Sequence, residues 1–320
     1  MRILSGIQPS GKLHLGNYLG AMKQHLDLQA KGEAFYFIAD FHALTSVKDP
    51  QALRGHIRDV ALDYLALGLD PAKCTFYSQS DVPEVPELAW LLTTVTPMGL
   101  LERCHSYKDK VAKGISPDHG LFAYPVLMAA DILIVDSNIV PVGKDQKQHV
   151  EVTRDIAIKY NALYGEVFVV PEDRILPEAG VVPGIDGLKM SKSYGNDIGI
   201  FLEGKALKER VMAIVTDSAA VEASKEPDTN NVYNLLKFFV SKEEDGEWRE
   251  RFLKGGLKYS DAKKRLIAVL DETFGPARER RKELVNRPDH VEDVMREGAK
   301  RAREIAAATL ARARKACGID

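Results

Sequence analysis

Cysteine is scarce in this chain of 320 residues, and a long apolar run is lacking. The three cysteines, Cys74, Cys104 and Cys317, form no CxxC pair, which excludes a disulfide framework and a cysteine-based zinc site. No run approaches the ~18 apolar residues of a membrane span, and the amino-terminal segment lacks the apolar core of a signal peptide. These absences predict a protein of the reducing cytoplasm that is neither exported nor bound to a membrane.

A large charge of one sign is also lacking, because 44 Lys and Arg nearly balance 46 Asp and Glu and leave a net charge of −2. The balance hides an asymmetry. Residues 1–236 carry 23 basic and 30 acidic side chains, whereas residues 237–320 carry 21 and 16. One basic face is enough to bind a polyanion such as tRNA, because phosphate contacts release counterions. A solvated helical surface without such a partner explains the same charges.

The apolar share of 45% is enough for one large core and a second, smaller one. In the first half, short apolar runs alternate with amphipathic ones, which is typical of a parallel sheet covered by helices. Strands are predicted at 2–5, 33–40, 74–78 and 139–142, and helices at 17–30, 50–68, 86–95, 123–133 and 146–160. The predicted fold class is α/β with a Rossmann-type doubly wound parallel sheet, which binds ligands at the carboxyl ends of its strands.

The composition of the chain changes after Val170, where proline and glycine become frequent. This change predicts a loop-rich domain boundary. Only helical patterns lie beyond it. We therefore expect a catalytic domain at 1–185 and an all-helical domain at 186–320, whose terminal helix packs back on the first domain. One face of that helix is apolar and the other is rich in Arg and Lys. The apolar face consists of Val291, Val294, Met295, Ala302, Ile305 and Thr309.

The first motif with chemical content is the loop Gly6–Gly11, GIQPSG, followed by His14–Asn17, HLGN, between the first strand and the first helix. Glycines let the backbone approach an anion closely, and the free N–H groups of a helix amino terminus attract phosphate. The segment therefore predicts a nucleotide site. Taken alone, Asn17 is equally an ordinary helix cap, and a glycine-rich turn after a first strand is common.

The second motif is Lys189–Ser193, KMSKS, in a loop bordered by Gly187 and Gly195. Two lysines three positions apart on a mobile loop can close on a polyphosphate, and the serines add hydroxyl donors. The plain alternative is a basic surface loop. The presence of an HLGN segment after the first strand favours phosphate binding.

Together the two motifs resemble the HIGH and KMSKS signatures of the class I aminoacyl-tRNA synthetases. Within that class the chain resembles the tryptophanyl-tRNA synthetase family over essentially its whole length. The similar segments are GIQPSG, MAADIL at Met128–Leu133, VPVGKDQKQHVE at 140–151 and PDTNNVYNLL at Pro227–Leu236.

The resemblance implies an ATP site built from both motifs. The first signature binds ATP, a strand-to-helix turn holds the ribose, the backbone at Val182 contacts adenine, and the second signature closes over the pyrophosphate. Lys110 reaches the leaving phosphates, although a solvated lysine is its plain alternative. Gln8, Asn17, Lys189 and Lys192 are expected to act in catalysis. The ATP-binding set is Gln8, Pro9, Ser10, Gly16, Asn17, Lys110, Gly143, Lys144, Asp145, Gln146, Val182, Lys189, Met190, Ser191, Lys192 and Ser193.

The resemblance also implies a tryptophan site. The indole ring offers a single polar group, an N–H that can only donate, so its site needs a buried acceptor within apolar walls. In this family the acceptor is the aspartate of MAAD, here Asp131. Plain core packing is the alternative for the apolar members, but a carboxylate within an apolar helix is costly to bury without a partner. The expected set is Asp131, Tyr124, Met128, Ile132, Gln146, His42, Val140, Val142, Leu4 and Gly6.

The implied reaction is activation of L-tryptophan by ATP to tryptophanyl-adenylate and pyrophosphate, followed by transfer to tRNA(Trp). The sequence contains no carboxylate cluster dedicated to a metal, so Mg²⁺ is expected to arrive with ATP. The family further implies a homodimer. The chain departs from the family pattern at Leu4, at Lys144 and at Tyr194-Gly195-Asn196, which affects the pocket edge, the local charge and the loop hinge.

Three other functions compete with this one. A tyrosyl-tRNA synthetase shares the fold and the signatures, but MAAD and GIQPSG argue against it. A HIGH-type nucleotidyltransferase that makes a cofactor would be shorter and would not explain the basic helical extension. A non-catalytic paralogue should have lost one of Gln8, Asn17, Asp131, Lys189 or Lys192, and all five are present.

Overall fold

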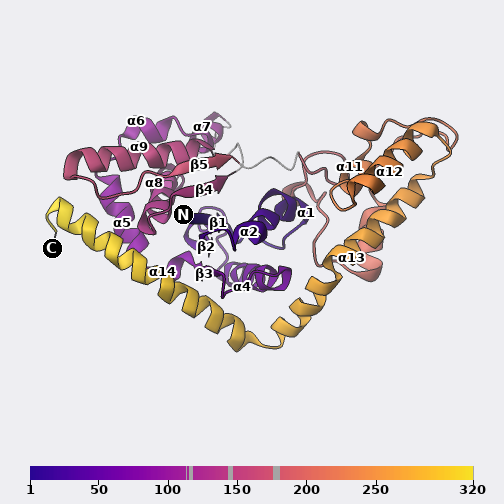
Figure 1. The fold of residues 1–320 in the computed structure, drawn as a ribbon. Coiled ribbons are helices and arrows are strands. Elements are labelled where there is room, and N and C mark those ends of the chain that lie inside the picture. The colour runs from indigo at the N-terminus through magenta and orange to yellow at the C-terminus, as the bar shows by residue number, and fades with distance from the viewer. Residues whose placement is uncertain (113, 115–117, 143–146, 176–180, 320) are drawn as a thin grey trace.

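A sheet of five parallel strands forms the centre of the protein in the computed structural model (Figure 1). The structure describes residues 1–112, 114, 118–142, 147–175 and 181–319, with the backbone alone at 106, 109, 110, 142 and 173–175. The strand order β3-β2-β1-β4-β5 confirms the predicted doubly wound α/β class. The strands are β1 (Arg2–Ile7), β2 (Glu33–Ile38), β3 (Cys74–Ser78), β4 (Ile139–Val142) and β5 (Glu172–Ile175).

The strands of the sheet interior are continuous apolar runs because helices cover both faces of the sheet. β2, EAFYFI, is buried from Ala34 to Ile38, and β3 is buried throughout. The four predicted strands are confirmed to within two residues at each end. The prediction of only helices after Val170 is wrong, because β5 pairs with β4 there. β5 is an edge strand with the polar sequence EDRI, so apolar periodicity could not reveal it.

Helices surround the sheet in the first part of the chain. The helix predicted at 17–30 begins at Leu15 and ends at Leu28, with a π-helical turn at Tyr18–Met22. The helix predicted at 50–68 begins after Asp49, which accepts hydrogen bonds from the N–H groups of Gln51 and Ala52, and ends before Gly68, at φ +103°. The helices of this part are α1 (Leu15–Asn17), α2 (Lys23–Leu28), α3 (Asp40–Ala43), α4 (Pro50–Leu67), α5 (Glu84–Thr93), α6 (Met98–Glu102), α7 (His105–Ala112), α8 (His119–Ile134) and α9 (Lys147–Tyr164). The short α3, α6 and α7 were not predicted.

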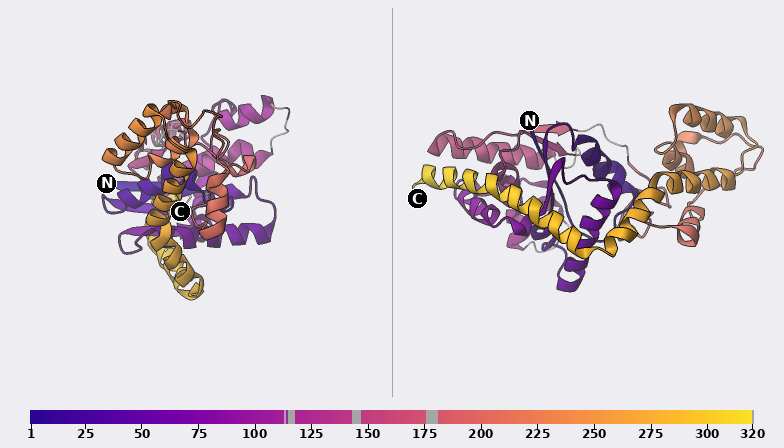
Figure 2. Two further views of the ribbon diagram at one scale, coloured as in Figure 1. Left: turned by 90° about the vertical axis from the view of Figure 1, so that its right-hand side faces the viewer. Right: turned by 60° about the horizontal axis from the view of Figure 1, so that its bottom comes forward.

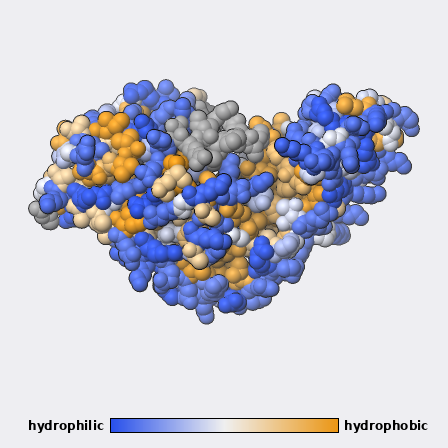
Figure 3. Space-filling view, in the orientation of Figure 1, coloured by the Kyte–Doolittle hydropathy of each residue, from blue (hydrophilic) through white to orange (hydrophobic). Residues whose placement is uncertain are grey.

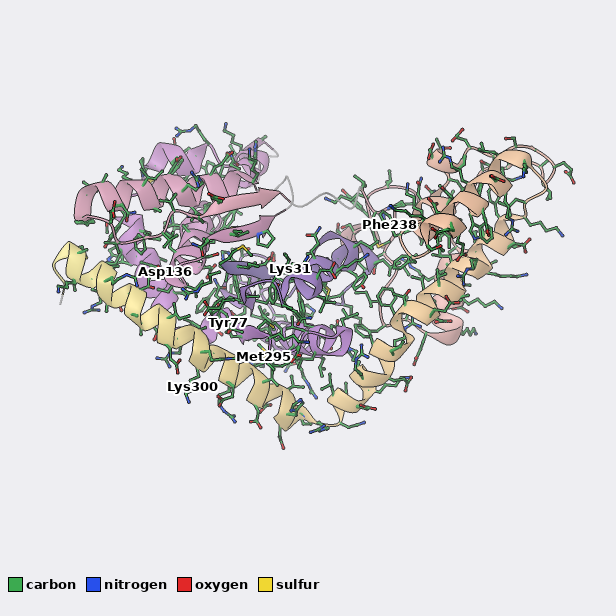
Figure 4. The ribbon with its side chains drawn as sticks, viewed as in Figure 1. Lys31, Tyr77, Asp136, Phe238, Met295 and Lys300 are labelled. Carbon is green, nitrogen blue, oxygen red and sulfur yellow. The ribbon has the colours of Figure 1, made fainter. Side chains whose placement is uncertain are left out.

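The chain from residue 204 onward is helical. The helices that precede its last one stand to one side of the sheet, and the long last helix runs back along the sheet (Figure 2). The helices of this part are α10 (Gly204–Met212), α11 (Asn231–Leu236), α12 (Lys242–Lys254), α13 (Tyr259–Val285) and α14 (Pro288–Cys317). α14 packs along β3 and α5. Of the face predicted to be apolar, Val291, Met295, Ala302 and Thr309 are buried, and Val294 and Ile305 are partly buried. Met295 lies on the side of α14 toward the sheet, and the exposed Lys300 points away (Figure 4).

Gly298 lets α14 approach β3 closely. A Cβ atom at this position would lie 1.8 Å from the carbonyl oxygen of Phe76. We expect Gly298→Ala to lower the free energy of unfolding by about 3 kcal/mol, because helix and strand must separate. Gly275→Ala in α13 is the matched control, since nothing lies within 4 Å of its added Cβ. This control should be neutral or stabilising by about 0.5–1 kcal/mol. Equal unfolding midpoints in urea for both variants would contradict the close approach.

Carboxylates of residues 1–236 take up much of the basic excess of residues 237–320. Arg281 on α13 bonds to Asp63 at 2.5 Å and to Asp59 at 2.6 Å, and Arg312 on α14 pairs with Asp136 at 2.6 Å. Exposed pairs contribute at most about 1 kcal/mol each, and burial of Asp63 adds a desolvation cost to its pair with Arg281. The main effect of the pairs is therefore to orient the two long helices. The two interpretations of the charge asymmetry were a surface for a polyanion and a solvated surface. Neither of them included ion pairs within the protein. Among the described residues, the other pairs that join residues 1–236 to residues 237–320 are Arg249–Asp228, Lys282–Glu203, Arg303–Glu84 and Arg314–Glu87.

None of the described helices combines the length and the apolar character that a membrane span requires. All three cysteines are free thiols, and Cys74 and Cys104 are buried.

Candidate active site

A cavity of about 490 Å³ opens toward the carboxyl ends of the central strands, where this sheet topology predicts ligand binding. Residues far apart in the sequence meet there, from β1, α3, α8 and β4. The structure thus brings most of the predicted tryptophan site together. The predicted residues that line the cavity are Leu4, Gly6, Gln8, His42, Tyr124, Met128, Asp131, Ile132 and Val140.

Asp131 is the one carboxylate among the described residues that line this cavity. It lies on α8 and is 3% exposed. Its Oδ1 and Oδ2 accept hydrogen bonds from Nε2 of Gln79 at 2.8 and 3.0 Å, and its Oδ2 lies 2.9 Å from Nε2 of His42. Burial raises the pKa of Asp131, and the contacts with His42 and Gln79 oppose that rise. The apolar helix therefore holds a buried carboxylate that has partners.

The remaining wall of the cavity is largely apolar. Leu4, Ile132 and Val140 are almost completely buried, so they belong to the protein core and line the cavity as well. Phe37 was not predicted, and it explains why position 6 is glycine. A Cβ at Gly6 would lie 2.5 Å from the Phe37 ring. This wall suits a flat aromatic ligand.

Polar side chains occupy another part of the cavity. The hydroxyl of Tyr124 lies 2.8 Å from Nε2 of His149, which is 4% exposed. The ring of Tyr124 also meets that of His42 edge to face. Gln8 donates weakly to the carbonyl oxygen of His42 and to Oγ of Ser46, both at 3.3 Å. Donors and acceptors for an amino acid backbone are therefore present beside the apolar wall.

The first helical segment begins at Leu15, within the HLGN part of the first signature. Oδ1 of Asn17 accepts a hydrogen bond from the backbone N–H of His14 at 3.1 Å. Asn17 is therefore the third helical residue of a capping box whose cap residue is His14. Pro9 is buried, and Ser10 is exposed. The backbone N–H of Gly16 lies 3.4 Å from Sδ of Met190. The first signature therefore contacts the second.

The second signature lies against the first through Met190 and Lys192. The buried Met190 donates its backbone N–H to the carbonyl oxygen of Val182 at 2.9 Å. Nζ of the half-buried Lys192 lies 3.6 Å from where a Cβ on Gly11 would be. Burial lowers the pKa of Lys192, and the charges of Asp197 and Asp63 oppose that change. Lys189 is exposed to solvent.

Asn196 fixes the shape of the loop that carries the second signature. Its Oδ1 accepts from the backbone N–H of Ser191 at 2.7 Å, and its Nδ2 donates to Asp186 Oδ1 at 2.8 Å and to the Lys189 carbonyl at 3.2 Å. Ser191 and Ser193 bond to each other through their hydroxyls at 2.8 Å. Tyr194 and Gly195 depart from the family pattern, whereas Asn196 agrees with it, so the loop keeps this anchor.

Some predicted residues lie outside the described part of the chain. These are Gly143, Lys144, Asp145 and Gln146, together with the side chains of Lys110 and Val142. Among the described residues, no group of three His, Cys, Asp or Glu side chains is placed to hold a metal ion.

Comparison with known proteins identifies the family. Residues 1–275 match the family described as "tRNA synthetases class I (W and Y)". A tryptophan–tRNA ligase of Fusobacterium nucleatum subsp. nucleatum is 54% identical over 319 residues, which cover 99% of this chain and 98% of the relative. A tryptophan–tRNA ligase of Rhodopirellula baltica is 52% identical, with both chains fully covered.

The chain belongs to the tryptophanyl-tRNA synthetase family. A solved tryptophanyl-tRNA synthetase from Campylobacter jejuni, complexed with ADP and tryptophan, matches it with a TM-score of 0.92 at 50% identity, over 99% of this chain and 100% of that one. The family description includes tyrosine enzymes, but these relatives are tryptophan enzymes. Membership of the tryptophanyl-tRNA synthetase family therefore disfavours the tyrosyl alternative.

Sequence reasoning missed several side chains of this synthetase site. Gln79 and His149 contact the predicted residues Asp131 and Tyr124, and Phe37 forms part of the wall. Gln79 directly follows the buried strand β3, and that position is the signal that could have revealed it. A larger cavity of about 870 Å³ lies between α4 and α14, and none of the predicted site residues lines it. Geometry and chemistry therefore favour the smaller cavity as the synthetase site.

Proposed function

We propose that this chain is an ATP-dependent tryptophan–tRNA ligase. One observation carries the proposal, a buried carboxylate, Asp131, in a largely apolar cavity at the carboxyl ends of the strands. A carboxylate only accepts, and the indole N–H only donates, so the two are complementary. A competing amino acid without that donor would leave Asp131 incompletely paired, which is costly in a buried site.

The reaction needs no protein nucleophile. A carboxylate oxygen of tryptophan attacks the α-phosphorus of ATP, the bond to pyrophosphate breaks, and tryptophanyl-adenylate forms. A terminal ribose hydroxyl of tRNA(Trp) then attacks the activated carbonyl and AMP leaves. The protein contributes positioning and charge, with Lys189 and Lys192 stabilising the leaving phosphates.

We propose that ATP spans the contact between the two signatures. Gln8, Gly16 and Asn17 contribute from one side and residues 189–193 from the other, and the contact of Gly16 with Met190 supports this arrangement. Gly143–Gln146, Lys110 and the backbone at Val182 complete the expected ATP site. Mg²⁺ is expected to enter with the ATP phosphates and to keep several waters, because such sites use few protein ligands.

We propose that residues 1–185 form the catalytic domain and that residues 186–320 carry the closing loop and the surface for tRNA. The face of the helical part seen at the right of Figure 3 is mainly hydrophilic, which suits a polyanion. After the ion pairs to residues 1–236 are formed, exposed cations such as Lys242 and Lys258 remain for phosphate contacts.

We further propose a homodimer in the cytoplasm. A groove of about 570 Å³ beside the tryptophan cavity shares His42, Thr45 and Tyr124 with it. Its lining includes Leu44 and Trp90, which are 49% and 68% exposed. Large apolar side chains with this exposure are typical of an interface, and a second copy of the chain is the proposed occupant. The free cysteines fit a reducing compartment.

ATP–pyrophosphate exchange tests the proposed function. The purified chain should exchange label into ATP when tryptophan is added and should not respond to tyrosine.

A further inference from the structure

Gln79 is a buried side chain that hydrogen bonds hold at both ends of its amide, next to the candidate tryptophan site. It follows β3 in the short turn Gln79–Asp81 and is 1% exposed. Its Oε1 accepts from the backbone N–H of Phe41 at 3.1 Å, and its Nε2 reaches both oxygens of Asp131. A backbone N–H can only donate, so the other end of the amide must be the NH₂ group. Gln79 therefore has one possible orientation, with its donors toward Asp131.

These contacts leave little acceptor capacity on Asp131. A carboxylate offers about four lone-pair positions, two on each oxygen. Gln79 uses one position on each oxygen, and His42 faces another on Oδ2. Among the described residues, no other group takes the remaining position, which is on Oδ1. A single substrate N–H is therefore the group that Asp131 can still accept.

We propose that Gln79 is a positioning residue that holds Asp131 ionised and turned so that one oxygen accepts the N–H group of the substrate ring. The inference rests on the proposed function and deepens it. It assigns part of the discrimination between tryptophan and ligands without a ring N–H to a residue that need not touch tryptophan. Gln79 acts by donating to the charged form of Asp131, which favours ionisation. Without those donors, Asp131 protonates more readily and rotates more freely.

Other charged and titratable groups surround this pair and must be considered in any pH experiment. His42 and Asp40 face it from α3, and Tyr77 faces it from β3. Asp40 is itself held by the backbone N–H and the hydroxyl of Ser80. These groups are the same in every variant below. Each pH profile is therefore read as the discrimination of the variant divided by that of the wild type.

The first test replaces Gln79 by methionine, which has a similar volume and no donor. The readout is kcat/KM in ATP–pyrophosphate exchange for tryptophan, divided by that for benzothienylalanine, in which sulfur replaces the indole N–H. Gln79→Met should lower this ratio about tenfold, because the loss of a hydrogen bond to a charged group typically corresponds to roughly tenfold or more. The KM for ATP should stay constant.

Gln29→Met is the matched control. Gln29 is another anchored glutamine, which donates to the Gly68 carbonyl at 3.2 Å and accepts from the Asp70 N–H at 2.8 Å, and it does not line the cavity. Gln29→Met should leave the ratio of kcat/KM for tryptophan to that for benzothienylalanine unchanged. An unchanged ratio in Gln79→Met as well would overturn the proposal.

The second test, Gln79→Glu, separates positioning from folding. The new carboxyl group lies against Asp131, and two carboxylates so close must share one proton. While that proton is bound, the introduced carboxylic acid donates to Asp131 as the amide does. The variant should therefore approach wild-type discrimination near pH 6 and lose it as the pH rises toward 9, when both groups ionise.

A variant-to-wild-type ratio that stays flat from pH 6 to 9 would contradict the proposed role, even if Gln79→Met failed to fold. The proposed function fails in a different way. In that case the wild-type chain itself would show no exchange with tryptophan, whereas failure of the Gln79 proposal alone leaves wild-type exchange intact.

Discussion

Asp131→Ala should lower kcat/KM for tryptophan about a hundredfold and leave ATP affinity unchanged. A hydrogen bond to a charged group contributes about 1.5–3 kcal/mol, which corresponds to roughly ten- to a hundredfold. The substitution also leaves Gln79 and His42 facing an apolar methyl group, which adds to the loss. The proposed ATP site lies at the two signatures, so ATP binding should not change. Exchange kinetics and equilibrium binding of each substrate measure these effects.

Discrimination gives the sharper readout for Asp131. Wild-type protein should prefer tryptophan strongly over benzothienylalanine, and Asp131→Ala should lose most of that preference because the N–H has no acceptor left. Asp136→Ala is a suitable control, because Asp136 pairs with Arg312 on α14 and does not line the cavity. Selectivity for tryptophan that survives in Asp131→Ala would refute the role given to this carboxylate.

Lys192→Ala should lower the rate of tryptophan activation by about 100–1,000-fold with little change in tryptophan affinity. Removal of one preorganised group that stabilises charge in a transition state typically has an effect of this size. Lys192 is half-buried beside Gly11, so it is already close to the first signature. Its contribution is expected to appear as negative charge develops on the leaving pyrophosphate.

The division of the effect between rate and binding decides the role of Lys192. Single-turnover formation of tryptophanyl-adenylate gives the rate, and the dependence on each substrate gives the affinities. Lys208→Ala on α10 is the matched control, because this exposed lysine lies outside the signatures and should have no effect. If Lys192→Ala lowered the rate and the affinity for ATP by the same factor, the lysine would contribute to binding of ATP in the ground state. It would then not stabilise the transition state.

The sequence was informative where local pattern and burial coincide. The apolar run at Glu33–Ile38 and the helical period at Pro50–Leu67 predicted their elements well, because most of the buried residues of each element are apolar. β5 was missed because an edge strand can be polar and still pair. The predicted tryptophan site was largely brought together in one cavity because family motifs specify contacts that periodicity cannot.

Gln79 and the ion pairs between residues 1–236 and 237–320 show the limit of sequence reasoning. A glutamine after a strand looks like part of a loop until the fold brings Asp131, far along the chain, to within 2.8 Å of it. The opposite charges of the two parts suggested a polyanion or solvent, but the pairing of Arg281 with Asp59 and Asp63 required the position of α13. In each case the partner is set by tertiary structure.

The central claim is that this chain activates tryptophan, and amino-acid-dependent ATP–pyrophosphate exchange tests it most directly. The purified chain is incubated with ATP, Mg²⁺ and labelled pyrophosphate, with each of the standard amino acids in turn. We expect exchange with tryptophan alone, and its loss in Asp131→Ala at the same tryptophan concentration. Exchange stimulated by tyrosine instead, or by none of the amino acids, would contradict the account.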